Sequence, residues 1–136
     1  MGSRAQAAME YLLIVGLSAM LVLPLIVVSM SQSQRFADDI TASQVENIAG
    51  AIIDSANTVY YSGEPAKKTI VLNFPERIQS VTVNNDSILF TVMSSSGTYE
   101  YVRYTNGPLN GTIRTFAGLH RITLEAWQNQ VNITDQ

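Results

Sequence analysis

The chain of 136 residues contains no cysteine, so it has no disulfide framework, no thiolate metal site and no cysteine nucleophile. Charged residues make up 14% of it, well below the share of about 25% in typical globular proteins. The net charge is −3 and there is no basic stripe, which argues against binding to nucleic acid. Zinc, calcium, phosphate-loop and serine-hydrolase motifs are missing as well. We therefore expect no catalytic residue, no metal, no cofactor and no enzymatic activity.

The polar residues that could have carried chemistry have simpler explanations. His120 is the only histidine, and in a strand between apolar positions we expect it to be structural or exposed rather than catalytic. Asp38 and Asp39 fall on the polar face of a predicted helix, where we expect solvent to cover both carboxylates. Lys67 and Lys68 are too few to form a nucleic-acid patch.

The scarce charge is unevenly distributed along the chain. Arg4 and Glu10 are the only charged residues before Arg35. From Tyr11 to Met30, Leu, Ile, Val and Met dominate, and as a helix this run would span about 30 Å, the thickness of a bilayer core. A domain this small cannot enclose such a helix on all sides. We expect the run to lie in a membrane, in a protein assembly, or in each at different times.

Three interpretations of this apolar run remain open. It is a secretory signal peptide cut near Ser29–Ser31, an uncleaved anchor, or a segment that is kept after cleavage on its N-terminal side. Glu10 favours the third interpretation, because a carboxylate at the head of an apolar helix is costly if it is buried without a partner. Another explanation places Glu10 at the membrane surface, where the helix dipole favours negative charge.

A helical pattern resumes directly after the apolar run. Gly63 and Pro65 supply a C-cap and a stop for it. We predict one helix from Gln6 to Tyr61, hydrophobic in its first half and amphipathic in its second. Pro24 removes one backbone hydrogen bond and should bend this helix. In the second half, apolar residues recur at steps of mostly three and four along one stripe: Phe36, Ile40, Val45, Ile48, Ala49, Ile52, Ile53, Ala56, Val59 and Tyr60.

The helical segment, residues 6–62, is followed by a β-rich segment, residues 63–136. Brief turns between short strands predict an antiparallel meander whose apolar face covers the stripe on the helix. The expected fold class is α+β, with a long N-terminal α-helix packed against a small C-terminal antiparallel β-sheet head. Alternating apolar positions predict the strands at Lys68–Phe74, Gln79–Val83, Ser87–Met93, Tyr99–Thr105, Thr112–Phe116, His120–Trp127 and Gln130–Thr134.

The β-rich segment contains three Asn-x-Ser/Thr sequons, at Asn85, Asn110 and Asn132. All three fall in predicted turns or at strand ends, where a glycan would be tolerated. As a set they agree with an extracellular head that carries N-linked glycans.

The first sixteen residues, MGSRAQAAMEYLLIVG, resemble the precursors of archaeal type IV pilins, which carry a class III signal peptide. That family has a short basic leader, a Gln at the first mature position and a Glu-Tyr pair beginning at mature position five. An unbroken apolar helix follows. In this chain residues 1–5 match the leader, Gln6 matches the mature N-terminus, and Glu10 and Tyr11 match the pair. The resemblance implies a lollipop-like pilin subunit.

The resemblance also implies a mechanism. A prepilin peptidase would cut between Ala5 and Gln6 on the cytoplasmic side, and the subunit would wait in the cytoplasmic membrane. The pilus assembly machinery would then build a helical homopolymer whose centre is a bundle of the apolar segments. Glu10 would pair with the new amine of Gln6 on an adjacent subunit and set the register. A pair within one chain is also geometrically feasible, since the two residues are one helical turn apart.

Adhesion is the usual role in this family, and its place is the extracellular pilus filament at the cell surface. The chain departs from the usual residues at Ala5 and Ala8, where family members often carry Gly and Ser. The alternatives are an anchored or secreted surface protein that does not polymerise, a minor pilin, and a subunit of a motility filament.

Overall fold

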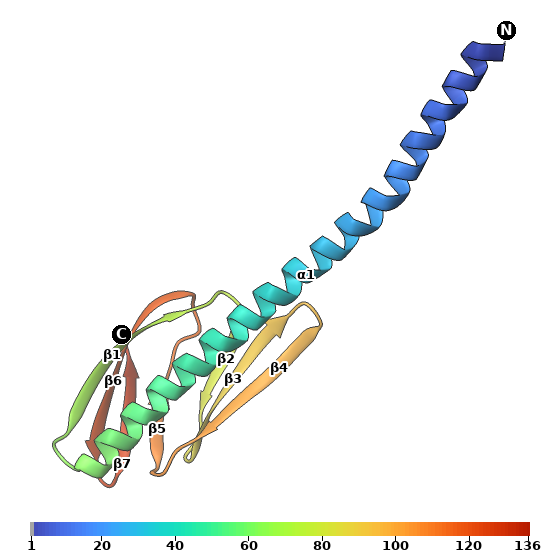
Figure 1. Cartoon of the computed structure of the whole chain (residues 1–136). Helices are drawn as coiled ribbons and strands as arrows, with labels where there is room; N and C mark the ends of the chain where they lie inside the picture. Colours follow the sequence, from blue (N-terminus) through green and yellow to red (C-terminus); the bar gives the residue numbers. More distant parts are fainter. Residues whose placement is uncertain (1) are drawn as a thin grey trace. The chain divides into compact units, whose positions relative to one another are not determined.

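The structure, a computed structural model, describes residues 2–136 apart from the side chain of Ser3. Met1, with which the predicted leader begins, lies outside the described residues. Within the described residues, one helix and seven strands follow one another: α1 (Gly2–Ser62), β1 (Lys67–Phe74), β2 (Ile78–Val83), β3 (Ser87–Ser94), β4 (Gly97–Tyr104), β5 (Leu109–Thr112), β6 (Gly118–Trp127) and β7 (Gln130–Asp135). The fold class is α+β, as the sequence predicts (Figure 1).

The chain divides into two compact units, which are described separately below. We call Met1–Ala37 the N-terminal unit and Asp38–Gln136 the head. The N-terminal unit consists of the first part of α1, which begins at Gly2 rather than at the predicted Gln6. Helical structure continues on both sides of Pro24, so the proline does not end the helix. The bend at Pro24 stays a prediction.

The head is built around the second part of α1, which packs against the strands (Figure 1). The helix ends as its sequence predicts. Gly63 has a φ of 67°, and its N–H donates to the carbonyl oxygen of Val59 at 3.2 Å. This is the left-handed C-cap that favours glycine. The buried core combines one face of the helix with residues from six strands: Val45, Ile48, Ala49, Ile52, Ile53, Ala56 and Val59 from α1, and Phe74, Ile78, Ile88, Phe90, Val92, Leu109, Ile122, Leu124, Ala126, Val131 and Ile133 from the strands.

The predicted single meander is wrong, because the strands form two sheets. One sheet has three antiparallel strands in the order β2-β3-β4, and this part is a meander. The other has four strands in the order β1-β6-β7-β5, and its β5–β7 pair is parallel. Gly111 makes that pair feasible. A Cβ at this position would lie 2.0 Å from the carbonyl oxygen of Ile133, so only glycine fits between the two backbones.

The strand predicted at Thr112–Phe116 is wrong as well. The strand in this region is β5, which ends where the predicted one begins. The alternation of β-formers had suggested a strand, but these residues leave the sheet after Thr112. The side chain of Phe116 then stacks on His120. The other predicted strands match β1, β2, β3, β4, β6 and β7 to within a few residues.

Two residues of the predicted apolar stripe lie outside the core. Phe36 is 63% exposed and Ile40 is 59% exposed, whereas the stripe from Val45 to Val59 is buried and Tyr60 is partly buried. The head therefore covers a shorter stretch of helix than the sequence pattern indicates. Burial begins at Thr41, within the first helical turn after Asp38.

Candidate assembly interface

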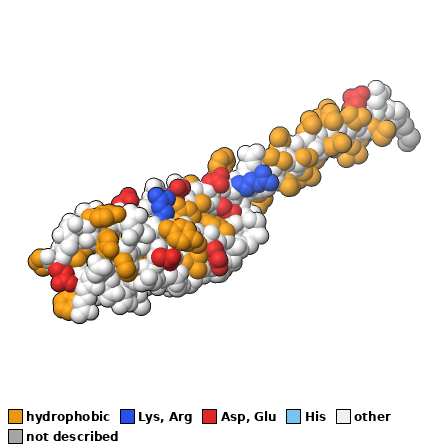
Figure 2. Space-filling model, turned by 90° about the horizontal axis from the view of Figure 1, so that it is seen from below, with side chains coloured by type: hydrophobic (Ala, Val, Ile, Leu, Met, Phe, Trp, Pro, Cys, Tyr) orange, Lys and Arg blue, Asp and Glu red, His pale blue; other side chains and the backbone are white. Residues whose placement is uncertain are grey.

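The apolar run of α1 is exposed on every side. Its large hydrophobic side chains between Met9 and Met30 are 45–73% exposed. Figure 2 shows hydrophobic side chains along the face of the N-terminal unit that is in view. By length and composition α1 is able to cross a membrane, and none of its most apolar window is buried among the described residues. An exposed surface this apolar requires lipid or protein around it.

The polar groups inside this run are satisfied within the helix itself. The hydroxyl of Ser18 donates to the carbonyl oxygen of Ile14 at 2.7 Å, and that of Ser31 donates to Val28 at 2.9 Å. A helix also satisfies its own backbone groups, so the run needs no polar partner from outside. Gly16, Ser18 and Ala19 have small side chains, which let a neighbouring helix approach the backbone closely. A Cβ at Gly16 would meet no atom of this chain within 4 Å, so this position is open to such a neighbour. The surface suits lipid tails and apolar helices equally.

Glu10 lies at the start of the run, next to Tyr11, which is 68% exposed. The Nε2 of Gln6 donates a hydrogen bond to Glu10 Oε1 at 3.3 Å. This is a long, exposed side-chain bond between neighbouring turns, and such pairs stabilise a helix by only about 0.2–0.5 kcal/mol. The carboxylate can therefore bind a stronger partner.

The predicted cleavage site lies directly before this pair. Ala5 and Gln6 are both helical and exposed. In the uncut chain the backbone nitrogen of Gln6 is part of a peptide bond, so the contact with Glu10 involves the side-chain amide. Cleavage would add a charged amine one helical turn from the carboxylate.

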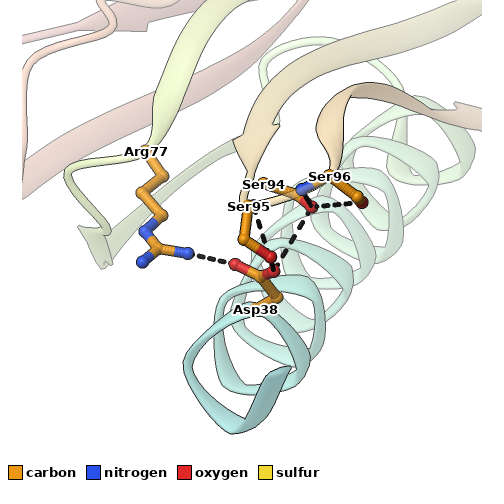
Figure 3. A network of polar contacts seen from close by, with 5 residues as sticks. All are labelled: Asp38, Arg77, Ser94, Ser95 and Ser96. Atoms are coloured by element: carbon orange, nitrogen blue, oxygen red, sulfur yellow. Dashed lines mark hydrogen bonds and ion pairs between the residues drawn. The ribbon is translucent and has the colours of Figure 1, made fainter. Parts of the chain in front are cut away.

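The sequence predicts that solvent covers the carboxylate of Asp38, at the start of the head. This prediction is wrong, because protein groups bind both of its oxygens. One oxygen of its carboxylate, Oδ2, accepts the backbone N–H of Ser95 at 3.0 Å and the hydroxyl of Ser94 at 3.3 Å. The Ser95 hydroxyl donates to the same oxygen, and Arg77 Nη1 forms an ion pair with Oδ1 (Figure 3). The neighbouring Asp39 is exposed, as predicted.

These contacts determine the acidity of Asp38 and the position of the helix. The hydrogen bonds from Ser95 hold the pKa of the carboxyl below its ordinary value, with a further contribution from Arg77, although desolvation acts in the opposite direction. They attach the first turn of helix in the head to the turn between β3 and β4. The sequence gives no reason to pair Asp38 with Ser95, because the two residues are 57 positions apart in the chain.

His120 belongs to the head core, where it is fully buried. Its Nδ1 lies 2.7 Å from Asp135 Oδ2, and its Nε2 lies 2.7 Å from the carbonyl oxygen of Phe116. The ring is stacked between Phe74 and Phe116, with centroid distances of 4.0 and 4.1 Å. The backbone N–H of Arg114 donates to the same Asp135 oxygen at 2.9 Å. The cluster fastens the segment after β5 to the sheet.

The three sequon asparagines are exposed, but only one lies where the sequence predicts. Asn85 is in the turn between β2 and β3. Asn110 lies inside β5 and Asn132 lies inside β7, so the prediction of turns or strand ends is wrong for these two. The strand around Asn110 was misplaced because the parallel β5–β7 pair leaves no local pattern in the sequence.

No cluster of three or more metal-ligating side chains occurs among the described residues. No family model, no curated protein and no solved structure matches the chain. The functional argument therefore depends on the residues and their arrangement.

Proposed function

We propose that the chain is a structural subunit of an extracellular archaeal type IV pilus that serves surface adhesion, and that it is not an enzyme. The observation that carries the proposal is the apolar run between Met9 and Met30, which is exposed all round. The same helix α1 supplies the central element of a head that has its own buried core. No residue between Met9 and Met30 belongs to that core, so the run is available for an intermolecular role.

Assembly moves this run from one apolar environment to another. In the membrane its Leu, Ile, Val and Met side chains face lipid, and in a filament they face the same side chains of neighbouring copies. Because lipid tails and these side chains are similarly apolar, little hydrophobic free energy is lost, and close packing adds dispersion contacts. A contact between copies related by a screw axis does not close into a ring and so gives a filament.

In this proposal Glu10 gives the filament its register. A prepilin peptidase cuts between Ala5 and Gln6 while the precursor is in the cytoplasmic membrane, and the assembly machinery then extracts the subunit. The new amine of Gln6 pairs with Glu10 of an adjacent copy. The weak contact between Gln6 and Glu10 within one chain supports this role, because it leaves the carboxylate available for a charged partner. Asn85, Asn110 and Asn132 are exposed, so an N-linked glycan on any one of them would face water.

Replacing Glu10 separates this proposal from a simple membrane anchor. The Glu10→Ala variant removes a charge from the head of an apolar helix, which makes membrane insertion easier. We expect this variant to accumulate in the membrane while surface filaments, counted by electron microscopy after shearing, fall at least tenfold. Glu46→Ala, an exposed glutamate on the head part of α1, is the matched control and should assemble normally.

Each rival predicts a different result. An anchored surface protein gives no filaments that contain the wild-type chain. A secreted protein leaves a soluble head in the medium and gives none either. Normal filaments from Glu10→Ala would overturn the role of Glu10 in register. The assembly of a minor pilin or of a motility-filament subunit would also depend on Glu10. A minor pilin is distinguished by deletion of this chain, after which the cells would still make filaments from another protein.

A further inference from the structure

Two of the sequons lie side by side on the sheet. In the parallel β5–β7 pair, Asn110 is the register partner of Asn132 and Thr112 is the register partner of Thr134. Register partners in neighbouring strands point to the same face of a sheet, and neighbouring strands are about 4.8 Å apart. The two acceptor asparagines are therefore adjacent, and so are the two threonines that complete the sequons.

The face that carries them is the outer one. Asn110, Thr112, Asn132 and Thr134 are all exposed. The residues that alternate with them point into the core: Leu109, Val131 and Ile133, of which each is no more than 4% exposed. A glycan on either asparagine would thus project from the sheet without disturbing the core.

We infer that Asn110 and Asn132 form a single modification site, which accepts one N-linked glycan and not two. A glycan is bulky, and the two asparagines are register partners on the same exposed face, one strand spacing apart, so a sugar on one takes up the space that a sugar on the other would need. The inference rests on the proposed extracellular position of the head. Either asparagine can be the acceptor, and modification of one excludes the other.

The sheet order gives the two asparagines different neighbours. β7 lies between β6 and β5, so Asn132 has Glu125 as a register partner on one side and Asn110 on the other. β5 is the last strand in the order, so Asn110 has a register partner on one side only. The turn that carries Asn85 lies beyond β5, because the backbone N–H of Leu109 donates to the carbonyl oxygen of Asn85 at 2.8 Å. Both asparagines therefore have neighbours on two sides, and the sheet order favours neither as the acceptor.

The third sequon has a different environment. Asn85 lies in the turn between β2 and β3, in the other sheet. The serine of this sequon, Ser87, is buried, and its hydroxyl donates to Asp86 Oδ1 at 3.0 Å. The Asn85→Gln variant removes this sequon, so that any N-linked glycan on the variant is on Asn110 or Asn132. The β5–β7 pair is unchanged in this variant.

The test is the intact mass of the full chain, expressed in its native cells as Asn85→Gln and recovered from the cell surface. The expected spectrum contains chains with one glycan at most. The variants Asn85→Gln/Asn110→Gln and Asn85→Gln/Asn132→Gln should each still carry one. The variant that lacks all three asparagines gives the mass without N-linked glycans. A chain with two N-linked glycans in Asn85→Gln would overturn the inference, and so would the absence of a glycan from both single-sequon variants.

Threonine variants and peptide mapping test the same inference without changing the asparagines. Thr112→Val and Thr134→Val each remove one sequon but keep its asparagine, and Thr→Ser at the same positions keeps the sequon. Trypsin places the two acceptors on separate peptides, Tyr104–Arg114 and Ile122–Gln136, and we expect each chain to carry the glycan on one of these peptides and not on both. Filaments whose chains begin at Gln6 but carry no glycan would contradict this inference and leave the proposed function standing.

Discussion

The carboxylate of Asp38 accepts the backbone N–H of Ser95 at 3.0 Å, although the two residues are 57 positions apart in the sequence. The contact joins α1 to the turn between β3 and β4, at the first residue of the head. Arg77, which precedes β2, binds the other oxygen of the same carboxylate. One side chain thus holds the helix against the sheet β2-β3-β4.

Replacing Asp38 by Asn should destabilise the head in a way that depends on pH. The contacts with Ser95, and then with Arg77, lower the pKa of Asp38 below its ordinary value of about 3.8. A group with a lowered pKa in the folded state stabilises it fully above the unfolded pKa, and the contribution is lost as pH falls through the folded pKa. The difference in Tm between the wild type and Asp38→Asn should therefore be constant from about pH 7 to about pH 5 and shrink below about pH 4.

Thermal unfolding of the full chain in detergent, followed by near-ultraviolet circular dichroism, measures this difference. Asp39→Asn is the matched control, because Asp39 is exposed and adjacent. Its Tm should stay close to that of the wild type. A difference for Asp38→Asn that is as large at about pH 2 as at about pH 7 would show that charge is not the cause.

Two glycines of the head should respond to alanine in opposite directions. At Gly107 a Cβ would lie 2.5 Å from two ring carbons of Tyr60, so Gly107→Ala forces the ring to move and should cost about 1–3 kcal/mol. At Gly50, inside α1, a Cβ meets nothing within 4 Å. Gly50→Ala should therefore stabilise the helix by about 0.5–1 kcal/mol. The measurement is Tm by the same method, and equal shifts in one direction would contradict the packing described here.

The buried pair of His120 and Asp135 should show strong coupling. His120→Leu leaves the carboxylate of Asp135 buried without its main partner, and its Oδ1 already has no partner among the described residues. We expect a loss of about 3 kcal/mol or more, as is usual when one member of a buried pair is removed. The double variant His120→Leu/Asp135→Leu should recover at least about 1 kcal/mol of that loss. Additive effects of the two single changes would mean that the pair is not coupled.

Local patterns in the sequence predicted much of this fold. The period of the apolar stripe and the Gly63 cap located the helix end, and alternation located most of the strands. The pairing of β5 with β7 could not be predicted in this way, because it joins segments far apart in the chain and depends on the close approach at Gly111. The adjacency of Asn110 and Asn132 was missed for the same reason.

The apolar run could be recognised from the sequence, whereas the polar contacts of the head could not. An apolar run with one carboxylate at its start is visible in composition alone, since Glu10 is the last charge before Arg35. The role of Asp38 depends on the place of Ser95 in space. A position on the polar face of a helix does not reveal whether a distant turn will cover it.

The most direct test of the central claim is the identity of the first residue of the chain in filaments sheared from native cells. Terminal-peptide mass spectrometry should recover a chain that begins at Gln6, in free or cyclised form, with the run from Tyr11 to Met30 still attached. A chain that begins at Met1 or Gly2 in the membrane, with no filaments, would identify an anchored protein. A soluble chain that begins near Gln32 would identify a secreted one, and either result would contradict assembly through the apolar helix.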